Sequence, residues 1–158
     1  IRIIDYYENN TYGLGHYAQI VLGKPYERYS YHFLPHDGSH RQLTADEKSQ
    51  SIQSQLMKLG LSNIKLIPRT NSVIEDIYSV RGILPLCSFN LAATKDGISC
   101  LKQYHREYDE KRRKFKDTPE HDWTSHGADA FRILPFAEKI ITKPQNNFKT
   151  KTFGGIKW

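Results

Sequence analysis

Short apolar stretches and amphipathic stretches alternate along this chain. Residues 1–4, 29–34 and 64–67 have the length and pattern of strands, and Pro35 stops the second of them. Residues 86–89 form a weaker strand pattern. Between these stretches, apolar residues recur every three or four positions, as they do on one face of a helix. Because parallel strands are joined by a crossover that is usually helical, the alternation predicts an α/β fold with parallel pairing in part of its sheet.

The predicted helices carry start and stop signals. They cover residues 12–22, 44–59, 72–84, 96–108 and 125–134. The start signals are two capping boxes and two single caps: Thr44 with Glu47, Ser72 with Glu75, Asp96 and Ser125. Gly60 and Pro85 are natural stops, and Pro135 is expected to break or kink the last helix.

Length and charge narrow the class of protein. The 158 residues suit one domain, expected over 1–142, followed by a basic tail at 143–158 that is predicted to be mobile. A net charge of +6 is typical of nucleic-acid binders, although many basic domains bind no nucleic acid. Cys87 and Cys100 form no CxxC pair, and no stretch is long and apolar enough to span a bilayer. We therefore expect a soluble intracellular protein with reduced cysteines.

The stretch HDWTSHGADAFR, residues 121–132, concentrates polar groups on a short predicted helix. His126 and Asp129 are three residues apart, which puts both side chains on one helical face. They could converge on a metal ion or form a hydrogen bond with each other. Trp123 stands at the entrance to this helix, where we expect it to be buried as an anchor.

Asp37 is the second candidate ligand, because it directly follows a predicted strand in the sequence PHDG. Cleavage of a phosphodiester by two divalent ions needs hard oxygen ligands from separate parts of the chain, since two cations about 4 Å apart must flank one phosphate. Asp37 and Asp129 have the right chemistry for such a pair. The alternative for Asp37 is an ordinary turn aspartate beside Gly38.

Four stretches, taken in order, resemble one protein family. They are IIDYYENNTYGLGHY, HFLPHDGSHR, LKQYHREYDEKRRKFKDTPEHDW and HDWTSHGADAFR. Together they are similar to the nuclease domain of the large terminase subunit of tailed bacteriophages and prophages, over roughly residues 1–134. The resemblance implies a ribonuclease H-like fold, in which helices flank a mixed sheet. It also implies a metal-dependent endonuclease that cuts concatemeric double-stranded DNA.

The resemblance assigns roles to three side chains. Asp37 and Asp129 match metal ligands for two Mg²⁺ or Mn²⁺ ions, and His126 matches a histidine at the same site, as a ligand or a proton shuttle. The family has a further catalytic aspartate on a strand before IIDYYEN, so we expect this chain to lack that first strand. Asp5 and Glu8 are other acidic residues nearby, for which a turn or strand-end role is the expected one.

A basic run before the motif is a candidate DNA contact. The residues expected to meet phosphates are Arg106, Lys111, Arg112, Arg113 and Lys114, with Lys116 beside them. The alternative is a solvated helix end, supported in part by Asp109 and Glu110. The resemblance further implies the terminase small subunit and the portal protein as partners, an ATPase domain upstream in the full protein, and the host cytoplasm as location. No GxxxxGK[ST] loop is present in this chain.

Other interpretations are weaker. GLGHYA, residues 13–18, fits a loose dinucleotide-binding pattern, but seven residues separate it from Asp5. His32, His36 and His40 have the spacing of helical zinc ligands, yet Pro35 interrupts that helix. The two His-Asp dipeptides are shared with HD-type phosphohydrolases, whose fold is all helical. A non-enzyme alternative remains, in which an incomplete site leaves a DNA-binding or packaging-assembly module.

Overall fold

The computed structural model describes residues 1–26, 28–42 and 49–142. The elements in chain order are β1 (Arg2–Ile3), α1 (Leu14–Leu22), β2 (His32–Leu34), η1 (His36–Ser39), β3 (Arg41–Gln42), β4 (Gln50–Ser51), α2 (Ile52–Lys58), β5 (Ile64–Leu66), α3 (Val73–Ile83), η2 (Leu84–Leu86), β6 (Ser88–Phe89), α4 (Leu91–Gln103), β7 (Arg106–Asp109), β8 (Lys114–Pro119), α5 (Ser125–Arg132) and α6 (Leu134–Thr142). The fold is therefore mixed α/β, as predicted. Both the basic tail at 143–158 and the capping box of Thr44 and Glu47 lie outside the described residues. None of the described helices has the length and apolar character needed to cross a membrane.

The strands pair in both directions. β2 and β5 are parallel, with His32 opposite Ile64 and Leu34 opposite Leu66, and β1 and β6 are also parallel. β3 with β4, and β7 with β8, are antiparallel. The predicted parallel pairing is confirmed. Within the described residues, however, the strands form four two-stranded ladders rather than one mixed sheet. The parallel ladders are only two or three residues long, so each contributes few backbone hydrogen bonds, and neither extends to the other.

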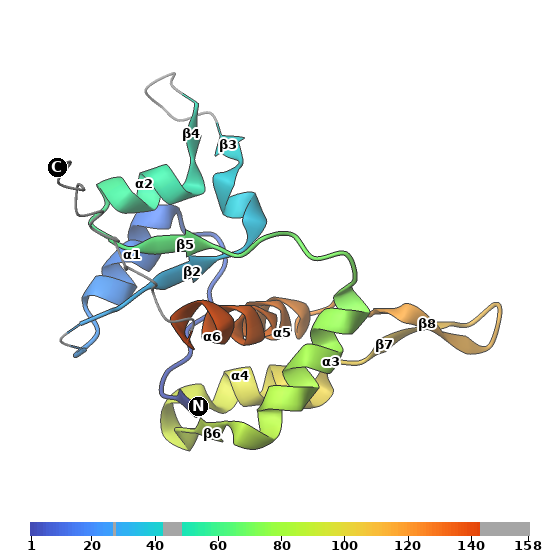
Figure 1. The fold of residues 1–158 in the computed structure, drawn as a ribbon. Helices are drawn as coiled ribbons and strands as arrows, with labels where there is room; N and C mark the ends of the chain where they lie inside the picture. The colour runs from blue at the N-terminus through green and yellow to red at the C-terminus, as the bar shows by residue number, and fades with distance from the viewer. Residues whose placement is uncertain (27, 43–48, 143–158) are drawn as a thin grey trace, which may run out of the picture.

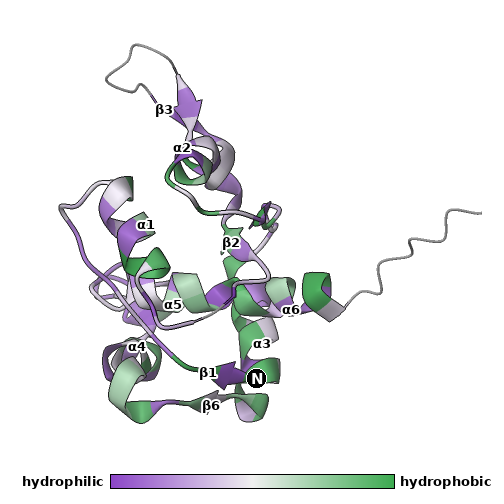
Figure 2. Cartoon of the chain, turned by 90° about the vertical axis from the view of Figure 1, so that its left-hand side faces the viewer, coloured by the Kyte–Doolittle hydropathy of each residue, from purple (hydrophilic) through white to green (hydrophobic). Residues whose placement is uncertain are grey.

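Two groups of elements lie on either side of α5 and α6. In Figures 1 and 2, the β2–β5 ladder lies with α1 and α2 above this helix pair, and β1, β6 and α4 lie below it. The upper group has a small apolar core of Ala18, Leu56, Leu61 and Ile64. α5 packs against both α3 and α4, and α6 packs against α3. α5 thus lies between α3 and α4 and contacts both.

Two predicted helices, α2 and α4, have clearly different boundaries, whereas α3 lies where it was expected. α3 begins as expected, with the Ser72 hydroxyl accepting a hydrogen bond from the amide of Glu75 at 3.3 Å. α2 begins only at Ile52, because Gln50–Ser51 pairs as β4 and Ser51 caps the helix. α4 begins at Leu91 and ends at Gln103, so Asp96 lies inside it and is not its cap. Tyr108, expected on this helix, belongs to β7.

The start of α5 is built from hydrogen bonds among neighbouring polar residues. The amide of Thr124 donates to Asp122 Oδ1 at 2.9 Å, and the amide of Asp122 donates to Ser125 Oγ at 2.9 Å. Pro135 lies in the first turn of α6, at the predicted break. The expected burial of Trp123 is wrong, because 56% of its surface is exposed. Thr124 and Ser125 are the buried residues here, and their hydrogen bonds hold the helix start without the indole.

Candidate functional site

A groove of about 910 Å³ opens between the β2–β5 ladder and α5. Its walls come from the segments that follow β2 and β5, from the start of α3, and from α5 and α6. Because β2 and β5 are parallel, the segments after both strands open on the same side, which is where open α/β sheets bind ligands. The groove is therefore the natural place to look for a site.

Asp37 enters the groove from η1, immediately after β2. Gly38 is buried beneath it, and a Cβ atom at this position would lie 3.1 Å from the side chains of Leu34 and Leu66. The close packing of this glycine fixes the backbone and leaves the neighbouring carboxylate on the surface. Asp37 is exposed, and its carboxylate has no hydrogen-bond or ion-pair partner among the described residues. A turn aspartate usually bonds to its own backbone, so this carboxylate is unusually available.

His126 and Asp129 line the same groove from α5. Asp37, which is far from His126 and Asp129 in the sequence, is thus brought to the same surface as these two predicted metal-site residues. The alternative hydrogen bond between His126 and Asp129 is not formed in this part of the described structure, because Asp129 pairs with Arg132 and the ring of His126 faces His121, with ring centroids 6.0 Å apart.

Asp76 is a third carboxylate in the groove, and the sequence analysis missed it. Only 6% of this residue is exposed, and its Oδ2 accepts a hydrogen bond from Thr70 Oγ1 at 2.6 Å. Arg132 joins the two acids: its Nη2 lies 3.3 Å from Asp129 Oδ1 and its Nε lies 3.9 Å from Asp76 Oδ2. The sequence offered one weak indication: Asp76 lies one turn before Val80, which belongs to the apolar stripe of the predicted helix.

The donor chemistry of the groove suits a hard divalent cation. Carboxylate oxygens are the ligands that Mg²⁺ and Mn²⁺ prefer, and Asp37, Asp76 and Asp129 supply them. Among residues 1–26, 28–42 and 49–142, no three His, Cys, Asp or Glu side chains are gathered closely enough to hold one ion. The residues therefore have the donor chemistry for such ions, and one oxygen of Asp129 is paired with Arg132.

Tyr104, a half-buried tyrosine, lies close enough to Asp129 to feel its charge. Burial raises the pKa of Tyr104, and the negative charge of Asp129 raises it further. Its hydroxyl therefore stays protonated through neutral pH and above. This group adds no charge to the neighbourhood of the carboxylates.

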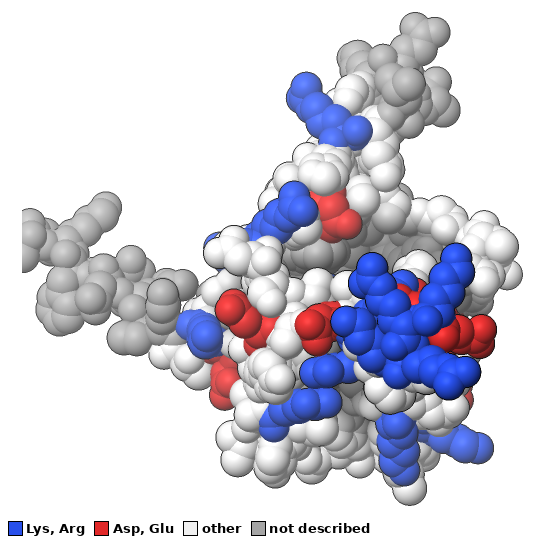
Figure 3. Space-filling view, turned by 90° about the vertical axis from the view of Figure 1, so that its right-hand side faces the viewer, with Lys and Arg blue, Asp and Glu red and all other residues white. Residues whose placement is uncertain are grey.

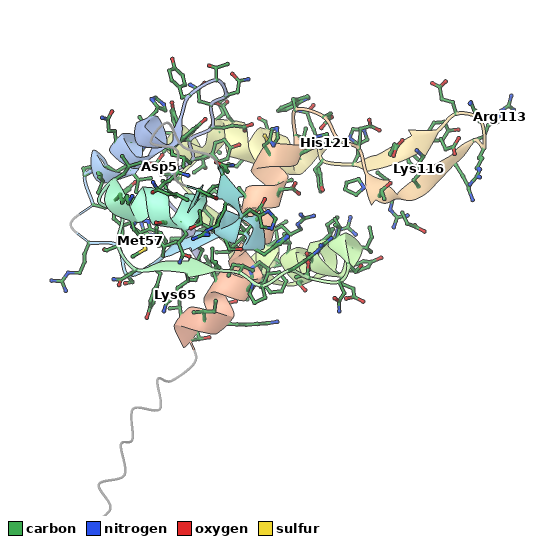
Figure 4. The ribbon with its side chains drawn as sticks, turned by 90° about the horizontal axis from the view of Figure 1, so that it is seen from above. Asp5, Met57, Lys65, Arg113, Lys116 and His121 are labelled. Carbon is green, nitrogen blue, oxygen red and sulfur yellow. The ribbon has the colours of Figure 1, made fainter. Side chains whose placement is uncertain are left out.

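The basic run forms a hairpin instead of the predicted helix end. Tyr108 and Phe115 face each other across β7 and β8, with ring centroids 5.1 Å apart, and this cross-strand pair supports the hairpin. Arg113 closes the turn with a φ of 48°. Figures 1 and 4 show the hairpin extending from the body, with Arg113 at its far end and His121 near its base.

Cations gather on the outer part of this hairpin (Figure 3). Arg106 pairs with Asp117 at 3.7 Å, Arg112 pairs with Asp109 at 3.9 Å, and Lys116 pairs with Glu107. The other predicted DNA contacts, Lys111, Arg113 and Lys114, have no ion-pair partner among the described residues. These three cations are the ones most available to a phosphate backbone.

The acids near the start of the chain have structural partners, as the turn interpretation predicts. Asp5 accepts hydrogen bonds from the amide of Tyr6 and the hydroxyl of Tyr26, and its Oδ2 lies 2.6 Å from Lys24 Nζ. The hydrogen bond and charge of Lys24 hold the pKa of Asp5 below its usual range, against the opposing effect of burial. Glu8 accepts from the Tyr6 hydroxyl. Asp5 lines a second pocket, of about 580 Å³, on the far side of β2.

The weaker interpretations find no support in the geometry. β1 ends at Ile3 and α1 begins at Leu14, so the glycines of GLGHYA do not follow a strand end. His32 lies in β2 and His36 in η1, so with His40 they share no helix.

Comparison of the chain with family models, with curated proteins and with solved structures finds no match. The groove, the hairpin and the sequence motifs are therefore the features of this chain that indicate a function.

Proposed function

We propose that this chain is the nuclease domain of a viral genome-packaging terminase, a metal-dependent endonuclease with a ribonuclease H-like fold. It would cut concatemeric double-stranded DNA by two-metal-ion hydrolysis. One observation carries the proposal: Asp37 and Asp129, chosen from distant motifs, line one groove at the ends of two parallel strands.

Four polar side chains of the groove have a role in this proposal. Asp37 and Asp129 would hold the cations, with Asp76 behind Asp129. Bound Mg²⁺ or Mn²⁺ would supply an activated water and neutralise charge on the leaving oxygen. His126 presents an exposed imidazole to the groove, where it can accept or return a proton.

The hairpin would hold the duplex. Its cations at Arg106, Lys111, Arg112, Arg113 and Lys114 would contact phosphates, which orients DNA without reading its sequence. In the full packaging machine we expect an upstream ATPase domain, the terminase small subunit and the portal protein as partners, in the cytoplasm of an infected bacterium.

The test uses the full chain and a supercoiled plasmid with Mn²⁺ or Mg²⁺. We expect nicking or cutting with little sequence preference, and we expect Asp129→Asn and Asp37→Asn to abolish it. Asp96→Asn, which removes the same charge from an exposed site on α4, is the matched control and should cut normally. Because both candidate ligands are at least partly exposed, their variants should melt close to the wild-type temperature without metal. Cutting by Asp129→Asn at the wild-type rate would remove this assignment.

A second function has its own support: a catalytically incomplete module that binds DNA or assists packaging assembly. In the described ranges no three metal-binding side chains converge, and Arg132 already pairs with Asp129. For such a module, DNA binding would be independent of Mn²⁺ and no cutting would occur. Equal DNA affinity with Mn²⁺ and with a chelator, together with intact plasmid, would favour this alternative.

A further inference from the structure

One guanidinium holds the two carboxylates on the α3–α5 side of the groove. Arg132 Nη2 lies 3.3 Å from Asp129 Oδ1, and Arg132 Nε lies 3.9 Å from Asp76 Oδ2. The arginine side chain is 23% exposed, and it comes from the last turn of the helix that also carries Asp129. Its positive charge compensates the negative charges of these two acids.

The two acids depend on this arginine to different degrees. The Asp76 side chain is only 8% exposed, so removing its positive partner would leave an unpaired carboxylate with little access to water. Thr70 satisfies part of its hydrogen-bonding capacity. The Asp129 side chain is 45% exposed, and an i,i+3 pair at that exposure contributes little. Asp129 is therefore the acid that Arg132 can release at small cost.

Arg132 and a metal ion would also compete for the Asp129 carboxylate. Its guanidinium keeps its charge at every accessible pH, so raising the pH does not release Asp129 by deprotonating Arg132. A divalent cation that approaches Asp129 meets both the existing ion pair and a like charge within a few ångströms.

We propose that Arg132 is a built-in counter-ion of the groove: it occupies Asp129 in the cation-free chain and yields that carboxylate to a divalent cation while it keeps Asp76. Arg132 is then a positioning residue that sets the metal affinity of the site. This inference rests on the proposed function, because it takes Asp129 as a metal ligand.

The experiment measures Mn²⁺ binding to the full chain by electron paramagnetic resonance, without DNA, and so has a readout independent of cutting. Arg132→Gln removes the charge and keeps a similar length. We expect it to bind Mn²⁺ about tenfold more tightly than wild type, equivalent to about 1.4 kcal/mol. Arg132→Lys keeps the charge but loses the two-pronged guanidinium geometry. Its Mn²⁺ affinity should lie between those of wild type and Arg132→Gln. The control Arg81→Gln, on the exposed side of α3, should bind like wild type.

Melting curves provide a second measurement. Asp76 loses its counter-ion in Arg132→Gln, so this variant should melt lower than wild type without metal and gain more from Mn²⁺. If Arg132→Gln does not fold, the comparison of Arg132→Lys with wild type decides the question alone. If the folded Arg132 variants bind Mn²⁺ no more tightly than wild type, Arg132 is not a counter-ion that limits metal binding. The nuclease proposal would be unaffected by that result. If neither wild type nor any Arg132 variant binds Mn²⁺, Asp129 is not a metal ligand and both proposals fall.

Discussion

Two aspartates that follow strand-like segments, Asp5 and Asp37, have opposite surroundings. The carboxylate of Asp5 is held by Lys24 at 2.6 Å, by the Tyr26 hydroxyl and by a backbone amide. The carboxylate of Asp37 has no such partner within the described ranges. A carboxylate with compensated charge stabilises the fold, whereas a free one at a groove can bind a ligand. Residue type alone does not distinguish the two cases.

The bound carboxylate of Asp5 makes stability depend on pH. Its pKa is lower in the folded chain than in the unfolded chain, chiefly because of Lys24. Its contribution is therefore complete above the unfolded pKa and is lost as pH falls through the folded pKa. We expect Asp5→Asn to lower the free energy of unfolding by about 1 kcal/mol at neutral pH. Urea melts at several pH values should show this difference shrinking below about pH 4. A difference that stays constant down to pH 2 would contradict the charged pair.

At the scale of elements, α5 positions His126 and Asp129 because its opposite face packs closely against Tyr6 and α4. A Cβ atom on Gly127 would lie 2.6 Å from the Tyr6 hydroxyl and 2.9 Å from Cys100 Cβ and Sγ. Gly127 and Ala128 are buried, while the flanking His126 and Asp129 reach the groove. The glycine therefore lets α5 approach α4 closely enough to set the position of both polar side chains.

This packing predicts the effect of adding one methyl group. Gly127→Ala should destabilise the chain by about 1–3 kcal/mol, because the Tyr6 ring and the Cys100 Cβ have little room to move. It should also weaken Mn²⁺ binding, since α5 must shift. Gly82→Ala on α3 is the matched control: nothing lies within 4 Å of its Cβ position. That change should stabilise by about 0.5–1 kcal/mol. Chemical denaturation of both variants measures their free energies of unfolding. Equal changes in the two variants would show that the contact between Gly127 and its neighbours is not tight.

At the scale of the molecule, a cluster of cations lies apart from the groove. The groove is lined by Asp37, Asp76 and Asp129 together with Arg69 and Arg132. The β7–β8 hairpin, which projects from the body, carries its own group of cations (Figures 3 and 4). β8 leads through a short connection into α5, so the hairpin and the groove are linked by neighbouring chain. A polyanion bound by the hairpin would thus be tethered close to the element that carries His126 and Asp129.

The salt dependence of DNA binding tests this arrangement. Replacing Lys111, Arg113 and Lys114 with alanine should weaken DNA binding and reduce the slope of log affinity against log salt by about 2–3, if each contacts one phosphate. A control triple at exposed lysines outside the hairpin, Lys58, Lys95 and Lys102, should leave the slope nearly unchanged. Fluorescence anisotropy with a labelled duplex gives both slopes. Equal slopes for wild type and the hairpin triple would show that its cations do not touch the backbone.

The parts of the fold set by neighbouring residues could be predicted. β5 and α3 lie close to their expected positions, because apolar periodicity, a capping serine and a stopping proline act within a few residues of each other. The hairpin could not be predicted in this way. Tyr108 follows Tyr104 at helical spacing, and its true partner, Phe115, is found only after the chain reverses at Arg113.

The candidate site, like the fold, has features that the sequence could predict and features that it could not. The sequence by itself determined which side chains have the chemistry of a metal site, namely Asp37, His126 and Asp129, because residue type and motif are local properties. Only the tertiary structure decided that they share a groove, that the buried Asp76 joins them, and that Arg132 holds two of the acids. Those relations depend on the packing of α3 against α5 and on the parallel pairing of β2 with β5, which join residues distant in the chain.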